Sequence, residues 1–278
     1  MNVLEFSAVV FAGSLAAGFL GALTGFGGGV VIVPLLTLGL GVDIRYAIGA
    51  SLVSVIATSS GAAAAYVKEG FSNIRIGMFL ELATTIGTLL GAALAGVISG
   101  GAIAVIFGLF LVYSAWLSGR PRRERAAGEK ADPMAAALKL DGHYPGPAGW
   151  VDYHVRAVPT GFSLMLVAGT LSGLLGIGSG AVKVLAMDLA MGLPFKVSTT
   201  TSNFMIGVTA AASAGLYLNR GYIDPGLAMP VVLGVLLGAS AGARRLAGAK
   251  SRTLRLVFAS VILVLGAQMI YKGVTGQL

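Results

Sequence analysis

Two glycine-rich segments interrupt apolar stretches and are the first candidates for a functional site. They read Gly25-Phe26-Gly27-Gly28-Gly29 and Gly176-Ile177-Gly178-Ser179-Gly180. Such a run cannot hold a regular helix, because each glycine loses maximal backbone entropy on folding. In lipid a broken backbone leaves polar groups that only protein or a water-filled cavity can satisfy. A short apolar stretch follows each break, and the N–H groups at its start would favour an anion.

The structural alternative is that these glycines only allow helices to pack closely. Two matched breaks, each opening a short helix, favour the interpretation as a site. Hydroxyl and amide groups placed nearby in the sequence suit the oxygens of an oxyanion, although Ser and Thr in membrane helices usually bond their own helix. The expected anion site comprises Gly27, Gly28, Gly29, Ser51, Gly178, Ser179, Gly180, Lys183, Thr201, Ser202 and Asn203.

Two charged residues fall within apolar stretches and therefore need an explanation. A cation such as Lys183, three residues after the second break, is a functional hypothesis by default in a membrane segment. It could pair with a substrate anion, form a salt bridge with Asp188, or extend to the membrane surface. Glu81 could carry a coupling proton or could hydrogen-bond at the interface.

The chain contains an internal repeat with an offset of 151 residues. Gly25 pairs with Gly176 (176 − 25 = 151) and Ser51 pairs with Ser202 (202 − 51 = 151). The same offset relates Arg45 to Lys196, Tyr66 to Tyr217, Gly87 to Gly238 and Phe107 to Phe258. Chance alignment of a serine, a tyrosine and a basic pair in one frame is improbable, so the chain reads as two copies of one unit, a known transporter plan.

Composition places the chain in the membrane. Of its 278 residues 56% are hydrophobic and 11% are charged, with a mean hydropathy of +0.88, whereas soluble domains carry about 25% charged residues. The net charge of +8 is better explained by cytoplasmic loops than by nucleic acid. No cysteine is present, and His143 and His154 lack metal-ligand spacing. No metal, no cofactor and no enzymatic reaction are expected, since no catalytic motif is found.

The expected fold is an all-α polytopic membrane protein with two inverted-topology repeats. Each repeat would hold a glycine-broken re-entrant helix pair and three spanning helices. Residues 1–118 would form the first repeat, 119–158 a cytoplasmic linker that could hold a small hairpin, and 159–278 the second repeat. Within the linker, Trp150–Arg156 alternates like a short strand. Placing the linker inside puts fifteen of the 19 Lys and Arg residues in the cytoplasm.

Expected helices cover Val3–Thr24, Val30–Leu40, Arg45–Val67, Ile74–Ile98 and Ala102–Leu117 in the first repeat, and Thr160–Leu175, Ala181–Met191, Lys196–Leu218, Leu227–Leu246 and Leu254–Tyr271 in the second. The first of these, Val3–Thr24, is long enough to cross a bilayer alone, which competes with its re-entrant role.

The glycine segments resemble the signatures of a known family. Gly21-Ala22-Leu23-Thr24-Gly25-Phe26-Gly27-Gly28-Gly29, followed by Val33-Pro34, is similar to the first signature of the TauE/SafE family of sulfite exporters, and Gly173–Val184 is similar to the second. Two departures are Ser179, where the family usually has glycine, and Leu185, where it usually has proline. The second departure predicts a less kinked half-helix.

The resemblance implies a secondary transporter in the cell membrane that exports small sulfur-containing anions, such as sulfite or organosulfonates, by alternating access. The alternative is a passive anion channel or uniporter. Small-residue helix faces and the resemblance make a homodimer in the lipid bilayer a reasonable expectation. The residues themselves predict only an anion site between two inverted copies.

Overall fold

The computed structural model describes residues 2–24, 29–68, 71–118, 132–146, 149–178, 180–246 and 251–277. Within them the chain is built mainly of helices, as the sequence predicts. The first half holds α1 (Val3–Thr24), α2 (Gly29–Pro34), the π-helical η1 (Leu35–Gly39), α3 (Ile44–Lys68), α4 (Ile74–Ala95) and α5 (Gly100–Ser118). The second half holds α7 (Val158–Leu175), α8 (Gly180–Leu185), the π-helical η2 (Ala186–Ala190), α9 (Phe195–Asn219), α10 (Pro225–Leu246) and α11 (Ser251–Thr275).

The two halves match element by element. The pairs α2 and α8, α3 and α9, and α4 and α10 have equal lengths of 6, 25 and 22 residues. In both halves the short helix continues into a π-helical turn of five residues, which the sequence analysis missed. The turns begin at Leu35 and Ala186, again 151 residues apart (186 − 35 = 151). Pro34 precedes the first turn and Leu185 the second, so the π turn does not depend on proline.

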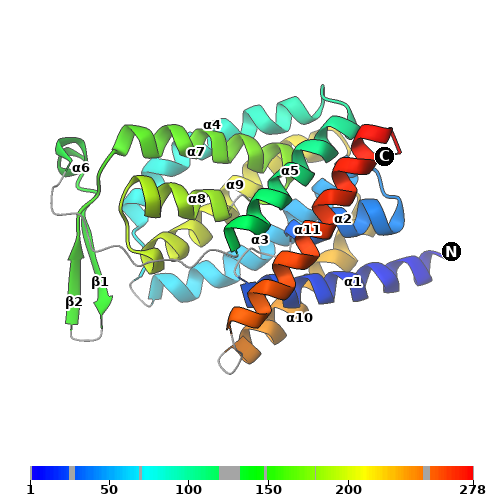
Figure 1. Cartoon of the computed structure of the whole chain (residues 1–278), viewed down its shortest axis with the longest axis horizontal. Coiled ribbons are helices and arrows are strands. Elements are labelled where there is room, and N and C mark those ends of the chain that lie inside the picture. The colour runs from blue at the N-terminus through cyan, green and yellow to red at the C-terminus, as the bar shows by residue number, and fades with distance from the viewer. Residues whose placement is uncertain are drawn as a thin grey trace.

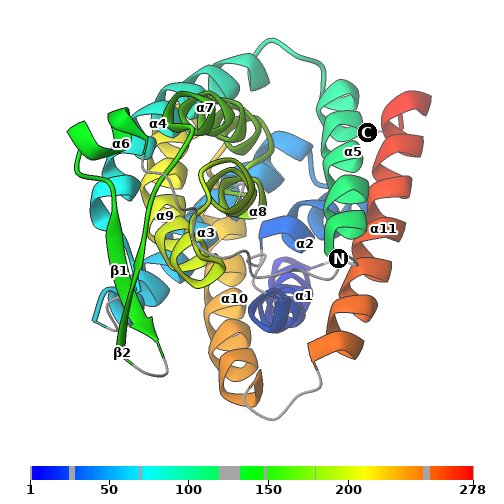
Figure 2. The ribbon, with the colours of Figure 1, turned by 60° about the vertical axis from the view of Figure 1, so that its left-hand side comes forward.

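Helix packing repeats in the same way. Helix α1 packs against α10 and α7 packs against α4, and these two pairs are equivalent under the repeat. Two other contacts join equivalent helices, α3 with α9 and α5 with α11 (Figures 1 and 2), and the contacts of α4 with α9 and of α10 with α3 are again a pair related by the repeat. Corresponding helices of the two halves therefore have corresponding neighbours, while the inverted orientation of the halves stays a prediction.

Several glycines shared by the repeats serve helix packing. A Cβ added to Gly87 of α4 would lie 2.1 Å from the carbonyl oxygen of Leu166 in α7. A Cβ on Gly238 of α10, the repeat mate of Gly87, would lie 2.0 Å from the carbonyl oxygen of Leu15 in α1. Close backbone approach of this kind is how small residues join membrane helices. Close helix packing therefore accounts for Gly87 and Gly238 without a role in a binding site.

Four described helices are long and apolar enough to cross a membrane. The qualifying stretches are Val3–Leu20, Ile74–Ala95, Val158–Leu175 and Pro225–Gly242. Shorter apolar stretches lie in Gly29–Gly39, Ile44–Ser60, Gly100–Trp116 and Ala259–Thr275. Helices α1 and α7 thus have the length to span, and the re-entrant pairing expected for them stays a prediction.

The linker docks onto the helices through a small hairpin. After a short helix α6 (Pro133–Ala137), strands β1 (Gly142–Gly146) and β2 (Gly149–Tyr153) pair antiparallel. The sequence pattern predicts a strand that continues to Arg156, and β2 ends three residues earlier. The Asn73 side chain, at the start of α4, donates to the Tyr153 hydroxyl at 2.7 Å and to the Leu140 carbonyl at 3.0 Å. Burial raises the pKa of Tyr153 to about 12. The hairpin lies at one end of the molecule and both termini lie toward the other (Figure 1).

Candidate functional site

The first glycine segment ends against a serine of α3. A Cβ on Gly29 would lie 2.8 Å from the Ser51 Oγ and 3.5 Å from the carbonyl oxygen of Gly176. The Ser51 hydroxyl donates to that same carbonyl at 2.9 Å, and Ser51 is fully buried. One serine of the first half therefore touches both glycine segments and joins the two halves.

The second glycine segment meets the equivalent serine of α9. The Ser202 hydroxyl donates to the carbonyl of Gly180 at 3.3 Å. Gly176 and Gly178 have φ values of +67° and +68°, in the left-handed region that glycine adopts without steric cost. A Cβ on Gly178 would lie 2.8 Å from Ile206 of α9 and 3.3 Å from Val55 of α3. The glycine segments thus meet between α3 and α9.

The remaining expected polar residues on α9 differ in their surroundings. The hydroxyl of Thr201 accepts the backbone N–H of Asn73 at 3.0 Å, so this buried side chain faces the start of α4 and not Gly180. Asn203 is half-buried and makes no hydrogen bond with any residue that the structure describes. Gly27, Gly28 and Ser179 lie outside the described residues.

A second polar cluster adjoins the serines and brings Lys183 together with Glu81. Lys183, on α8, is fully buried, and its Nζ donates to the Thr209 Oγ1 at 2.5 Å. The Thr209 hydroxyl, on α9, lies 2.7 Å from the Glu81 Oε1 on α4 and 2.8 Å from the Met205 carbonyl oxygen of its own helix, and it can donate its one proton to either acceptor. The Thr85 hydroxyl approaches the same carboxylate oxygen at 3.4 Å. A single hydroxyl group therefore bridges a buried ammonium and a buried carboxylate. We call Lys183, Thr209 and Glu81 the buried relay.

Sequence reasoning named both charges of the relay and missed its centre. Thr209 is the repeat mate of Thr58 (58 + 151 = 209) and stands seven residues after Ser202. Seven residues are close to two helical turns, so both hydroxyls fall on one face of α9. This combination of repeat and helix spacing could have identified Thr209.

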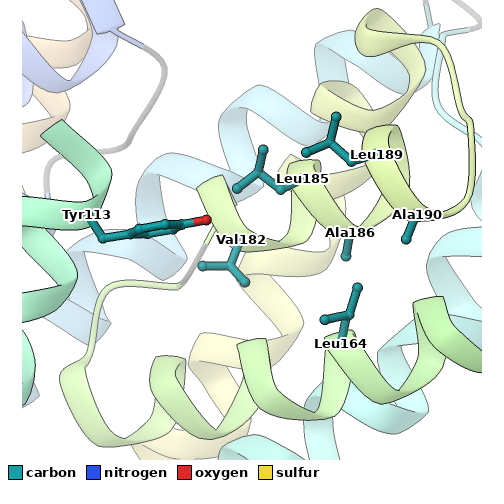
Figure 3. Close-up of a pocket in the computed structure, with 7 residues that line it drawn as sticks. All are labelled: Tyr113, Leu164, Val182, Leu185, Ala186, Leu189 and Ala190. Carbon is teal, nitrogen blue, oxygen red and sulfur yellow. The ribbon is translucent and has the colours of Figure 1, made fainter. Parts of the chain in front are cut away.

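The described pockets lie away from these residues. A pocket of about 230 Å³ lies between α5, α7 and the helix formed by α8 and η2 (Figure 3). It is lined by Tyr113, Leu164, Val182, Leu185, Ala186, Leu189 and Ala190. The Tyr113 hydroxyl, directed toward α8, is the one polar side-chain group in this lining, which does not suit an anion. A second pocket, of about 500 Å³, is lined by Leu38, Ala267, Gln268, Tyr271 and Lys272.

Among the described residues no group of three or more His, Asp or Glu side chains could hold a metal ion. The two histidines lie in the linker hairpin or beside it. His154 contacts the Asp141 carboxylate at 3.1 Å, and the His143 ring packs edge-on against Trp150. Around the two serines and the buried relay, the polar chemistry is therefore that of hydroxyls, the Asn203 amide, the Lys183 ammonium and the Glu81 carboxylate.

Comparison with known proteins agrees with the membrane character of these helices. The chain is 29% identical over 268 residues to "Probable membrane transporter protein YunE" of Bacillus subtilis (strain 168), covering 94% of this chain and 96% of the relative. It is 28% identical over 250 residues to "Probable membrane transporter protein YdhB" of the same organism, covering 85% and 87%. A "Probable membrane transporter protein ORF9" of Sinorhizobium sp is 26% identical over 262 residues, covering 93% and 90%.

No solved structure matches the chain. The family model described as "Sulfite exporter TauE/SafE" matches residues 10–269, which include both glycine segments, both serines and the buried relay. The chain therefore belongs to the TauE/SafE family of sulfite exporters.

Proposed function

We propose that this protein is a secondary transporter that exports small sulfur-containing anions, such as sulfite or organosulfonates, across the cell membrane. The observation that carries the proposal is the meeting of both glycine segments at Ser51 and Ser202, beside the fully buried Lys183. The sulfur chemistry and the export direction come from the family, and the relatives named above are described as membrane transporters.

The chemistry of these residues fits a small oxyanion. Ammonium, hydroxyl and amide groups are hydrogen-bond donors, and sulfite oxygens are acceptors. Lys183 would supply the positive charge, Ser51 and Ser202 would turn their hydroxyls from backbone carbonyls to the anion, and Asn203 would donate its amide. Glycine at positions 29 and 180 would let the anion approach the backbone, since no Cβ stands in the way.

The repeated packing of the two halves supports alternating access. Equivalent helices contact each other at α3–α9 and α5–α11, and a transporter can open a central site to either side by moving such units against each other. We propose that the halves are inverted relative to each other and that the linker lies in the cytoplasm. A homodimer remains part of this proposal.

The test is counterflow of radiolabelled sulfite in liposomes that contain purified protein. Preloaded sulfite should accelerate entry of the label, because a transporter exchanges substrate through one site, whereas a channel does not. Ser202→Ala and Asn203→Ala should each lower exchange at least tenfold, equivalent to about 1.4 kcal/mol of binding. Ser240→Ala is the matched control, since Ser240 is exposed and its hydroxyl bonds the Leu236 carbonyl in its own helix. Unchanged exchange in both site variants would contradict the proposed site, and flux without counterflow would favour the channel.

A further inference from the structure

The buried relay is the most unusual polar feature of the described helices. Lys183 and Thr209 are fully buried and Glu81 is 8% exposed, yet the relay joins three separate helices, α8, α9 and α4. One oxygen of the Glu81 carboxylate, Oε2, is buried without a hydrogen-bond partner among the described residues. A carboxylate with one unsatisfied oxygen is poorly stabilised as an anion, so its charge depends on Lys183.

Among the described residues, no charged side chain other than Lys183 faces Glu81 so directly from the elements around it. Helix α7 carries no titratable side chain, and α9 carries Lys196 and Tyr217 near its two ends. Arg75 lies at the exposed start of α4 and reaches toward the Lys139 carbonyl. Asp188 lies in η2, five residues after Lys183. Within the described part of the chain, only Lys183 is linked to Glu81 through a single hydrogen-bonded group.

The relay is present in one half only. Its repeat mates are Ile32 for Lys183, Thr58 for Thr209 and Val232 for Glu81, each at an offset of 151 residues. Ile32 is fully buried, and the Thr58 hydroxyl bonds the Ser54 carbonyl of its own helix, as Thr209 also bonds the Met205 carbonyl, but Thr58 has no charged partner among the described residues. The first half therefore forms the equivalent packing with no charge at all. A purely structural pair would not explain why the second half needs charges where the first half does not.

The relay also lies close to the proposed anion site. Lys183 stands three residues, nearly one helical turn, after Gly180, whose carbonyl accepts the Ser202 hydroxyl. An anion beside these groups would compete with Thr209 for the Lys183 ammonium. Binding would then remove the positive charge on which Glu81 depends.

We infer that the relay couples anion binding to the uptake of one proton by Glu81, so that the protein carries a proton together with each anion. This inference rests on the proposed function. Without substrate, the positive Lys183 and the negative Glu81 balance each other. With a singly charged anion on Lys183, the Glu81 carboxylate takes one proton from solution and becomes a neutral carboxylic acid. The buried site has zero net charge in both states, and neither state leaves an uncompensated charge in the low-dielectric interior.

Two consequences are measurable. By linkage, protonation of Glu81 must strengthen anion binding as much as anion binding strengthens protonation. A one-proton coupling makes the apparent Kd for the anion rise about tenfold per pH unit over the range in which Glu81 loses its proton. The transported charge for a singly charged anion is zero, so the membrane potential should not drive the flux. Because the proton moves with the anion, a cytoplasm more alkaline than the outside opposes export, so net export requires an anion concentration ratio, inside over outside, that exceeds the opposing proton ratio.

The experiment uses radiolabelled sulfite and liposomes with an imposed pH gradient, with protein-free liposomes to subtract leakage. Wild-type protein should accumulate the label transiently on the alkaline side, and the variant Glu81→Gln should not. Glu81→Gln should retain sulfite counterflow within a few-fold, since glutamine resembles the protonated carboxylic acid, and its sulfite Kd should lose the protein's tenfold pH dependence. Because sulfite itself titrates, each wild-type pH series is compared with the same series on Glu81→Gln.

A matched pair of variants separates the relay from general packing. Thr209→Val should uncouple flux from the pH gradient, whereas Thr58→Val, its repeat mate, should behave like wild type. Gradient-driven flux that persists in Glu81→Gln, or wild-type flux that is electrogenic for the singly charged anion, would overturn the inference while the transport function stands. Charge movement is measured on the wild-type protein, so this test does not depend on whether a variant folds. Absence of any sulfite flux in wild-type protein would instead overturn the proposed function.

Discussion

Replacing Lys183 with methionine is the sharpest test of the buried pair as a physical unit. The substitution keeps an unbranched side chain of similar length and removes the charge. Among the described residues, the Glu81 carboxylate would then keep uncharged hydroxyl groups as its partners, including those of Thr209 and Thr85. Because Lys183 is fully buried and Glu81 is 8% exposed, water cannot replace the lost ammonium. Removing one partner of a buried ion pair typically costs about 3–5 kcal/mol, and we expect a loss of this size in the free energy of unfolding.

A double-mutant cycle distinguishes the lost charge from the altered shape. Lys183→Met combined with Glu81→Gln leaves no buried charge, so the double variant should recover most of the stability lost by Lys183→Met. We expect a coupling energy of about 2–3 kcal/mol between the two positions. Unfolding would be measured by titrating SDS into mixed detergent micelles.

The repeat supplies a matched control for this cycle. Ile32, the mate of Lys183, is also fully buried, and Ile32→Met conserves volume, so it should cost less than about 1.5 kcal/mol. A Lys183→Met variant no less stable than Ile32→Met would refute the reasoning. So would a double variant whose loss equals the sum of the two single losses, because the charges would then be independent.

Three further predictions concern packing, linker docking and topology. Gly173→Ala should cost about 1–3 kcal/mol of unfolding free energy, because its Cβ would lie 2.0 Å from the Thr88 carbonyl oxygen. The control Gly215→Ala, whose Cβ would have nothing within 4 Å, should be neutral or should stabilise α9 by up to about 1 kcal/mol. Equal losses of stability in the two variants would contradict the steric explanation. Asn73→Ala removes the N-cap of α4 and both side-chain hydrogen bonds to the linker, so it should lower the free energy of unfolding by about 1 kcal/mol and speed protease cleavage of the hairpin. Tyr153→Phe, which loses one of these hydrogen bonds, should have a smaller effect. An unchanged cleavage rate in Asn73→Ala would exclude this docking role. Since the chain has no cysteine, single introduced cysteines report topology directly. Trp150→Cys, at a position 65% exposed in the hairpin, should react with a membrane-impermeant maleimide only after permeabilisation, whereas Val274→Cys, at a position 73% exposed near the C-terminus, should react in intact cells. The reverse pattern of labelling would show that the orientation is opposite to the expected one.

Much of the helical framework follows from the sequence because its signals are local or repeated. Runs of apolar residues define the helices, and the offset of 151 residues matches each element with a mate. The same offset explains why Gly87 and Gly238 both lie against a backbone carbonyl. The π turns after α2 and α8 escaped prediction, since they change the backbone hydrogen-bond pattern without a change in hydrophobic period. The docking of the linker also escaped prediction, because it depends on contacts such as Asn73 with Tyr153, 80 residues apart.

At the site, residue type was easier to predict than side-chain direction. Successive residues on a helix point about 100° apart, and this separates Ser202, which bonds Gly180, from Thr201, which bonds the backbone of Asn73. Lys183 and Glu81 stood out as charges in apolar stretches, but their connection requires Thr209, whose role depends on the packing of three helices. A hydroxyl that bridges two charges has no signature in a single sequence beyond its repeat mate.

The geometry of α4 and α9 indicates which contact of the relay can change during transport. Three hydrogen bonds between these helices join residues 128 positions apart: Asn73 with Thr201, Glu81 with Thr209, and Ala92 with Arg220. A constant separation means that the helices run in the same direction in fixed register, which holds Thr209 against Glu81. Lys183 instead belongs to a six-residue helix between a glycine segment and a π turn. Movement of this short helix would separate Lys183 from Thr209 and leave Thr209 on Glu81, so the variable contact is the one that an anion on Lys183 would replace.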